Sequence, residues 1–217
     1  MDMLTAIRNS ALGLSIFAVI TSGAIALTQI STQDQIKLNE REARAKALYQ
    51  IVPKDSIENN LLEDTLSINE PALTGSTVPV DLFRARRNGQ VTTVIIPVTA
   101  PDGYTGNIDM IVGINADESV AGVRVLAHKE TPGLGDKVEL KKSTWLHGFD
   151  GQRYNGDDDP SWAVKKDGGR FDQFTGATIT PRAVVNATAR AIHYFREHKT
   201  ALLEARSNLN STPAGAE

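Results

Sequence analysis

The 217-residue chain contains no cysteine. This absence excludes disulfides, cysteine-ligated iron–sulfur clusters and thioether-linked haem. Its four histidines show no metal-ligand spacing such as HExxH, so each is expected to be an ordinary surface or core residue. If the protein transfers electrons, an organic cofactor must carry them.

An excess of positive charge is also lacking. Lysine and arginine number 23 against 26 aspartate and glutamate residues, so the formal net charge is -3 and nucleic acid is not an expected partner. Hydrophobic residues make up 41% of the chain and charged residues 23%, a globular rather than a disordered balance. The length allows one ordinary domain and an anchor.

The N-terminal region has no charged side chain between Arg8 and Asp34. Residues 11–30 are long enough to cross a hydrocarbon core of roughly 30 Å as a helix. The alternative is a cleaved signal peptide, because residues 24–26 (AIA) resemble its cleavage site. A retained anchor is favoured, since the segment continues without a turn signal into a charged helical stretch. Charge alone does not orient it, because only Arg8 precedes the span while several basic residues follow.

The rest of the chain predicts an α+β fold, an antiparallel meander with flanking helices, preceded by one N-terminal transmembrane helix. A helix over residues 36–51 is expected to end before Pro53. β-branched and alternating apolar residues predict three strands joined by short turns. The predicted strands are residues 91–98, 108–114 and 120–126, with turns at 100–106 and 115–118.

The pattern divides the chain into four parts. We expect a membrane anchor at residues 1–33, then a juxtamembrane helix and connecting region at 34–80 whose second half is rich in loops. A folded domain follows at 81–200, and a solvated, flexible tail at 201–217.

One loop, HKETPGLGD at residues 128–136, contains more residues suited to ligand binding than a plain turn requires. Its glycines permit positive φ and close approach of backbone to a ligand. Glu130 and Thr131 add a hydrogen-bond acceptor and a hydroxyl beside the backbone amides. Taken alone, the loop is better interpreted as a plain turn that leads into a helix over residues 137–146.

A second stretch, DQFTGATIT at residues 172–180, precedes a strongly periodic helix. Thr180 is suited to the N-cap and Pro181 to the first helical position. The turn before them lies at a helix N-terminus, which carries partial positive charge and free amides and suits a phosphate. On spacing alone, a simple helix cap is the favoured interpretation of these threonines.

Residues 172–178, DQFTGAT, resemble the flavinylation motif of the FMN-binding-domain family. The loop at 128–136 resembles the second signature of the same family, in the expected order. Length and the single anchor are most similar to the G-type subunit of Rnf/Rsx ion-translocating electron transport complexes. The C-type subunit of the sodium-translocating NADH:quinone reductase is a relative that shares both signatures and stays open as an alternative.

The resemblance implies a cofactor and its site. Thr178 would carry FMN as a covalent phosphoester, attached by a separate flavin transferase. Gln173 stands where the family often has glycine or serine, a tolerated variation. The remaining site residues implied are Asp172, Thr175, Gly176 and Ala177 in the motif, and Glu130, Thr131, Gly133, Leu134 and Gly135 in the upstream loop. Trp145, Phe149 and Trp162 could cover the flavin ring or belong to the core.

The resemblance also implies a setting. The protein would relay electrons between other membrane subunits of the complex, as a carrier rather than a complete enzyme. It would lie in the bacterial inner membrane with one span and its folded domain on the periplasmic side. A non-redox assembly module and a free-standing flavin reductase remain rival interpretations.

Overall fold

The computed structural model describes residues 3–156 and 159–204. The chain divides into two units, and the division falls between Arg44 and Ala45 in the sequence. The first consists of most of helix α1, Met3–Ile51. Among the described residues, the segment Ile7–Gln33 of this helix is long and apolar enough to cross a membrane. The helix ends before Pro53, as predicted.

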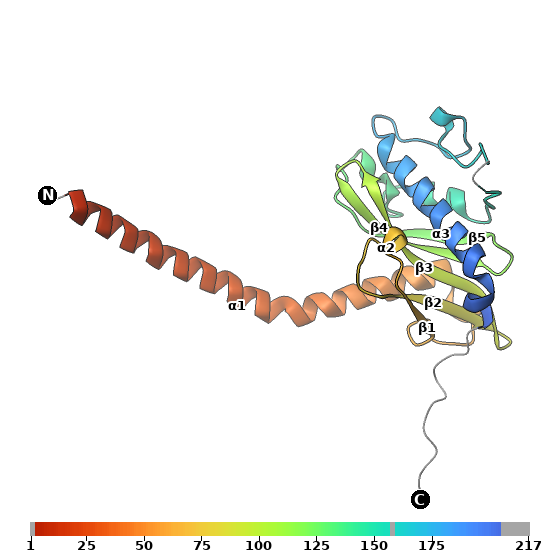
Figure 1. The fold of residues 1–217 in the computed structure, drawn as a ribbon, viewed down its shortest axis with the longest axis horizontal. Helices are drawn as coiled ribbons and strands as arrows, with labels where there is room; N and C mark the ends of the chain where they lie inside the picture. Colours follow the sequence, from red (N-terminus) through yellow and green to blue (C-terminus); the bar gives the residue numbers. More distant parts are fainter. Residues whose placement is uncertain (1–2, 157–158, 205–217) are drawn as a thin grey trace, which may run out of the picture. The chain divides into compact units, whose positions relative to one another are not determined.

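The second unit contains one antiparallel sheet in which strands lie side by side in chain order. This meander and its flanking helices confirm the predicted α+β class (Figure 1). The strands are β1 (Thr65–Ile68), β2 (Val80–Arg87), β3 (Gln90–Gly103), β4 (Gly106–Asn115) and β5 (Val120–Ala127).

Three details differ from the sequence prediction. The region expected to be loop-rich contains β1, and β2 adds a further strand that was not predicted. Strand β3 continues to Gly103, so the turn is only Tyr104–Thr105 rather than residues 100–106. Pro97 is tolerated inside β3 because the pairing with β2 reaches no further than Ile95, which leaves the β2 side of Pro97 an edge.

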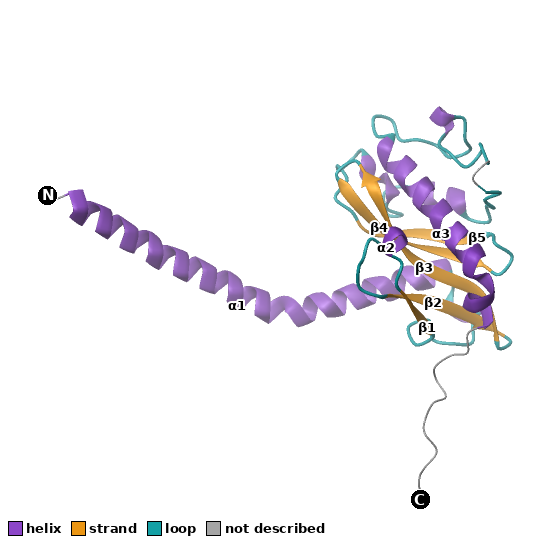
Figure 2. Cartoon of the chain, in the orientation of Figure 1, coloured by secondary structure: helices purple, strands orange, loops and turns teal. Residues whose placement is uncertain are grey.

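Of the other helices, η1 precedes the sheet, α2 lies between β1 and β2, and the rest follow β5. Helix α3 crosses one face of the sheet, and the long connection between β5 and α3 is largely loop (Figures 1 and 2). The α-helices of this part of the chain are α2 (Pro71–Thr74) and α3 (Ile179–Glu204). The short 3-10 helices are η1 (Lys54–Ser56), η2 (Gly135–Val138), η3 (Trp145–Phe149) and η4 (Lys165–Asp167).

The expected helix over residues 137–146 is therefore wrong. Two 3-10 turns, η2 and η3, stand in its place. The Ser143 hydroxyl accepts a hydrogen bond from the backbone N–H of Trp145 at 3.1 Å. Such local side-chain bonds compete with helical hydrogen bonds and favour turns.

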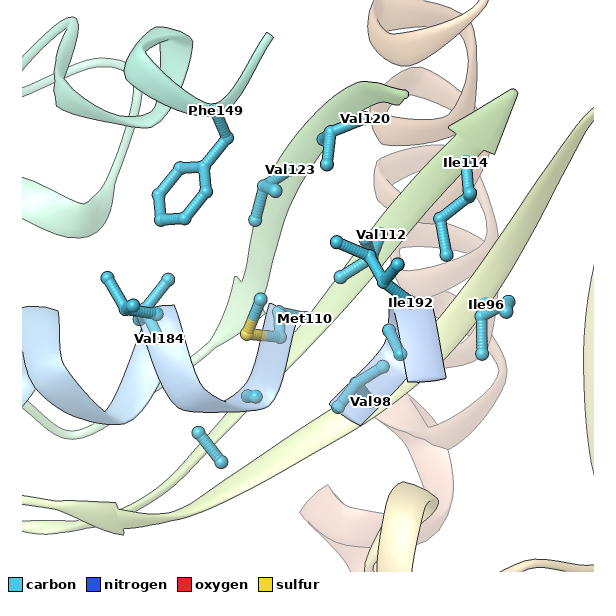
Figure 3. Packing of buried hydrophobic residues seen from close by; sticks show 14 of the residues in the cluster. Ile96, Val98, Met110, Val112, Ile114, Val120, Val123, Phe149, Val184 and Ile192 are labelled. Atoms are coloured by element: carbon cyan, nitrogen blue, oxygen red, sulfur yellow. The ribbon is translucent and has the colours of Figure 1, made fainter. Parts of the chain in front are cut away.

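Each face of the sheet is covered by a different helix. On one face, Val184 and Ile192 of α3 lie in the same buried cluster as Met110 on β4, and Figure 3 shows these side chains together. The opposite face carries the last turns of α1, where Leu48 and Ile51 pack with Ile95. Because successive side chains of a strand point to opposite faces of the sheet, the same strands contribute apolar residues to both buried clusters.

The end of α1 fits closely against the sheet. A Cβ at Gly113 would collide with the Ile51 Cγ2 atom, so a side chain there would displace the helix end. The buried Arg124 donates from Nη2 to the carbonyl oxygen of Gln50 at 2.9 Å. A cation at the last carbonyls of a helix is favourable for the helix dipole.

Candidate functional site

The segment Phe174–Ala177 forms a tight turn ahead of α3. The backbone N–H of Ala177 donates to the carbonyl oxygen of Phe174 at 3.0 Å. Gly176 has φ +79°, the sign that the third position of a type II turn requires. A Cβ at Gly176 would have ordinary contact only, with Leu134 at 3.6 Å. Backbone conformation rather than space therefore demands glycine here.

Thr178 lies at the N-cap of α3. Its carbonyl oxygen accepts the first helical hydrogen bond, from the N–H of Arg182 at 3.3 Å, and the helix starts at Ile179. The prediction that Thr180 is the N-cap is wrong, because the Thr180 hydroxyl instead donates to Glu130. Within residues 3–156 and 159–204, no hydrogen bond occupies the side chain of Thr178. Its half-buried hydroxyl is thus available beside free helix amides.

The upstream loop is also held by its own hydrogen bonds. The N–H groups of Leu134 and Gly135 both donate to the Thr131 carbonyl oxygen at 3.1 Å. Gly133 has φ +78°, and its N–H donates to the buried Asp136 carboxylate at 2.8 Å. These bonds fix the backbone conformation of the loop.

The Glu130 carboxylate joins three segments of the site. Its Oε1 atom accepts from the backbone N–H and the hydroxyl of Thr105, both at 3.0 Å, and its Oε2 atom accepts from the Thr180 hydroxyl. A Cβ at Gly135 would lie 2.6 Å from Oε2, so glycine is needed for this approach. The side chain therefore links the β3–β4 turn, the upstream loop and the start of α3.

Burial alone raises the pKa of the Glu130 carboxyl. Hydrogen bonds from Thr180 and Thr105, together with the nearby charge of His128, outweigh burial and leave the pKa below its ordinary value. The group is consequently ionised at neutral pH, and the site contains a fixed negative charge.

These segments enclose a pocket of about 340 Å³. Ligand pockets for small molecules span roughly 300–1,000 Å³, so this one lies at the lower end of that range. Among the residues implied by the motifs, the structure brings seven to the pocket wall: Glu130, Thr131, Leu134, Gly135, Gly176, Ala177 and Thr178.

Three implied residues lie outside the pocket wall. Thr175 is exposed in the turn, and Gly133 shapes the upstream loop. The exposed Asp172 forms an ion pair with Lys165 at 2.6 Å, and its carbonyl oxygen accepts from Trp145 Nε1 at 2.7 Å. Asp172 and Gly133 therefore support the segments that carry the wall.

Sequence reasoning missed three residues of the pocket. Tyr104 reaches it from the β3–β4 turn, while Ile179 and Thr180 belong to the first turn of α3. The available signal for Tyr104 was an aromatic residue inside a turn rich in glycine, at residues 103–106. Nothing in the local pattern indicates that this turn lies beside a helix start 75 residues later in the chain, from Tyr104 to Ile179.

The aromatic residues considered for ring contact belong to the core instead. Phe149 and Trp162 are buried, with ring centroids 6.2 Å apart. Trp145 is partly buried and meets Phe174 edge-on at 5.1 Å. This cluster packs beneath the turn and lies outside the pocket wall.

Two family models match this chain. Residues 103–193, which include both signatures and the β3–β4 turn, match the FMN-binding domain. Residues 3–51, the whole of α1 with its last turns, match the RnfG N-terminal region. All residues that line the pocket lie within the range that matches the FMN-binding domain.

Curated relatives are similar over nearly their whole length. The G-type subunit of the ion-translocating oxidoreductase complex of Pseudoalteromonas atlantica is 46% identical over 205 residues, covering 94% of this chain and 95% of the relative. Its counterpart in Vibrio cholerae is 47% identical over 200 residues, covering 92% and 95%. That of Pseudomonas aeruginosa is 48% identical over 197 residues, covering 91% and 92%. The chain belongs to this family of G-type subunits, the RnfG family of ion-translocating oxidoreductase complexes.

Among solved structures, the crystal structure of NqrC from Shewanella oneidensis is similar, with a TM-score of 0.48 and 23% identity. The match covers 69% of this chain and 72% of that one.

Proposed function

We propose that this protein is a membrane-anchored electron carrier with FMN esterified through its phosphate to Thr178. The observation that carries the proposal is the position of the Thr178 side chain, which lines the pocket and whose hydroxyl makes no hydrogen bond within the described ranges, at the N-cap of α3. Membership of the RnfG family and the match to an FMN-binding domain support the same cofactor.

The residues present suit a phosphodiester-linked flavin. The N–H groups of Ile179 and Thr180, in the first turn of α3, have no helical partner, and the helix dipole favours one remaining negative phosphate charge there. Gly135 admits the Glu130 carboxylate and the Thr180 hydroxyl close to the upstream loop, while Gly176 has only Leu134 near it at 3.6 Å and leaves the backbone of its turn accessible. FMN supplies one- and two-electron redox chemistry when bound, while the chain fixes its position and surroundings.

Attachment requires help from outside the chain. A threonine hydroxyl is a weak nucleophile without an adjacent base. The Glu130 carboxylate is already engaged by Thr105 and Thr180, and no base bonds to Thr178 within residues 3–156 and 159–204. A separate flavin transferase, with FAD as donor, is therefore the partner proposed for maturation.

We further propose that the protein works in a multi-subunit ion-translocating oxidoreductase complex of the Rnf type, relaying electrons between neighbouring membrane subunits. This assembly is what the names of its relatives state for them. The helix Ile7–Gln33 would be the single inner-membrane span, with the folded unit on the periplasmic side. A reporter fused after Glu217 tests the side, and activity of a cytoplasm-specific reporter would refute it.

The test of the cofactor is mass spectrometry of the full chain produced together with a flavin transferase. We expect an intact mass increased by FMN minus water, and a peptide that carries the addition on Thr178. An unmodified peptide, from a host that flavinylates a control protein, would instead favour a non-redox assembly module.

The turn conformation should control how fast flavin is attached. Gly176→Ala places a side chain at φ +79°, which costs about 1–2 kcal/mol and displaces the Thr178 hydroxyl. We expect slower flavin loading in a time course followed by intact mass. Gly176→Asn is the matched control, because asparagine adopts this conformation more readily, and it should load faster than the alanine variant. Equal loading rates for both variants and the wild type would contradict the role of the turn.

A further inference from the structure

The pocket wall contains a single aromatic side chain among the residues the structure describes, and it comes from an element that neither sequence motif includes. Tyr104 lies at the tip of the β3–β4 turn and is 66% exposed. Leu134 and Ile179, also at the wall, are 42% and 44% exposed. Large apolar side chains left open around one pocket indicate an apolar ligand part that covers them.

The backbone of the turn that carries Tyr104 is held by the residues on either side of it. Gly103 and Gly106 pair across the turn, and a Cβ at Gly103 would collide with the Gly106 carbonyl oxygen. Thr105, the next residue, is bound to the Glu130 carboxylate by its N–H and its hydroxyl. The same carboxylate accepts from Thr180, which follows closely after the attachment turn. One side chain thus sets the separation between the Tyr104 turn and the attachment turn.

We propose that Tyr104 covers one face of the isoalloxazine ring of the flavin and stacks on it. This inference rests on the proposed attachment of FMN at Thr178. The phenol ring is the wall element whose shape and π-system match a flat aromatic tricycle. Trp145, Phe149 and Trp162 do not compete for this role, because they pack among themselves away from the wall. The ring would be shielded on the Tyr104 side, and the electron-rich phenol would quench its fluorescence by donating an electron to the excited flavin.

The test uses the full chain, flavinylated by its transferase, as wild type, Tyr104→Phe, Tyr104→Leu and Tyr194→Phe. Tyr194 is the matched control, since it lies 14 residues beyond Thr180 on α3, or about 21 Å along the helix. Loading is measured by intact mass, and fluorescence is expressed per covalently bound flavin. Iodide quenching measures how exposed the ring is.

We expect the wild type and Tyr194→Phe to be weakly fluorescent and shielded from iodide. Tyr104→Phe should become bright but remain shielded, because phenylalanine stacks without donating an electron. Tyr104→Leu should be bright, and its iodide quenching constant should rise about two- to tenfold, the range that loss of an aromatic stack implies. A loaded Tyr104→Leu variant with the brightness and shielding of the wild type would overturn the inference. Absence of covalent flavin from the wild type would overturn the proposed function as well, so the two failures are distinct.

Discussion

The Thr178→Ala variant is expected to carry no covalent flavin while its fold is retained. Only the N-cap side chain is lost, and that hydroxyl forms no hydrogen bond with any residue in the described parts of the chain. Replacing a threonine N-cap by alanine usually costs roughly 1 kcal/mol, and less should be lost where the hydroxyl is not used for capping. Intact mass gives the load, and thermal unfolding followed by tryptophan fluorescence gives the stability.

Two further variants separate attachment from folding. Thr175→Ser keeps a hydroxyl in the same exposed turn and should load like the wild type. Thr178→Ser keeps the hydroxyl at the N-cap and should restore part of the load. Full covalent FMN on Thr178→Ala would show that the assigned residue is wrong, and a Thr178→Ala chain that fails to fold would show a structural role for the hydroxyl.

Removal of the Glu130 carboxylate is expected to have the largest effect on stability in the site. Glu130→Leu has similar bulk but leaves the Thr180 hydroxyl and the Thr105 N–H without an acceptor. The Thr180 side chain is fully buried, and a buried unsatisfied donor costs roughly 1–3 kcal/mol, so a loss of about 2 kcal/mol is expected in denaturant unfolding. Glu130→Gln retains an acceptor for Thr105 and should lose only about 1 kcal/mol. Equal stabilities of the leucine variant and the wild type would refute the role of Glu130 in joining the three segments of the site.

Acidification should reveal the same interaction. The pKa of Glu130 is lower in the folded protein than in the unfolded chain. Its ionised form therefore stabilises the fold fully above the unfolded pKa of about 4.3, and this contribution is lost as the pH falls through the folded-state pKa. The wild type should lose stability in this window more steeply than Glu130→Gln. Parallel curves for the two proteins below pH about 4.3 would contradict this assignment.

The centre of the sheet was predictable because its strands are β-branched and apolar. Strand β4 alternates cleanly, and its neighbours are joined to it by turns of a few residues. Strand β2 was missed because VDLFRARR contains four charged residues and Arg84 is buried in it. The Arg84 guanidinium pairs with Asp64 at 2.6 Å, a contact between distant residues that local patterns do not reveal.

The site was predictable as far as its two motifs extend. The resemblance of residues 172–178 and 128–136 to family signatures, rather than their spacing, indicated this turn and loop, and seven of the implied residues meet at one pocket. The rest depends on tertiary structure. Glu130 bonds to Thr180, 50 residues away in sequence, and so removes Thr180 from the capping role that its residue type favours.

The boundary between the two units lies within α1, before Ala45, and not at Gln33, where the apolar segment of the helix ends. Leu48 and Ile51 are part of the hydrophobic cluster with Phe83, Ile95 and Ile111. Burial of each such aliphatic side chain contributes roughly 1.5–3 kcal/mol. Proteolysis ahead of Ala45 would therefore release an intact folded unit, whereas cleavage after Val52 would uncover an apolar face and send the fragment toward aggregation. The end of the long N-terminal helix is thus also a structural part of the folded unit.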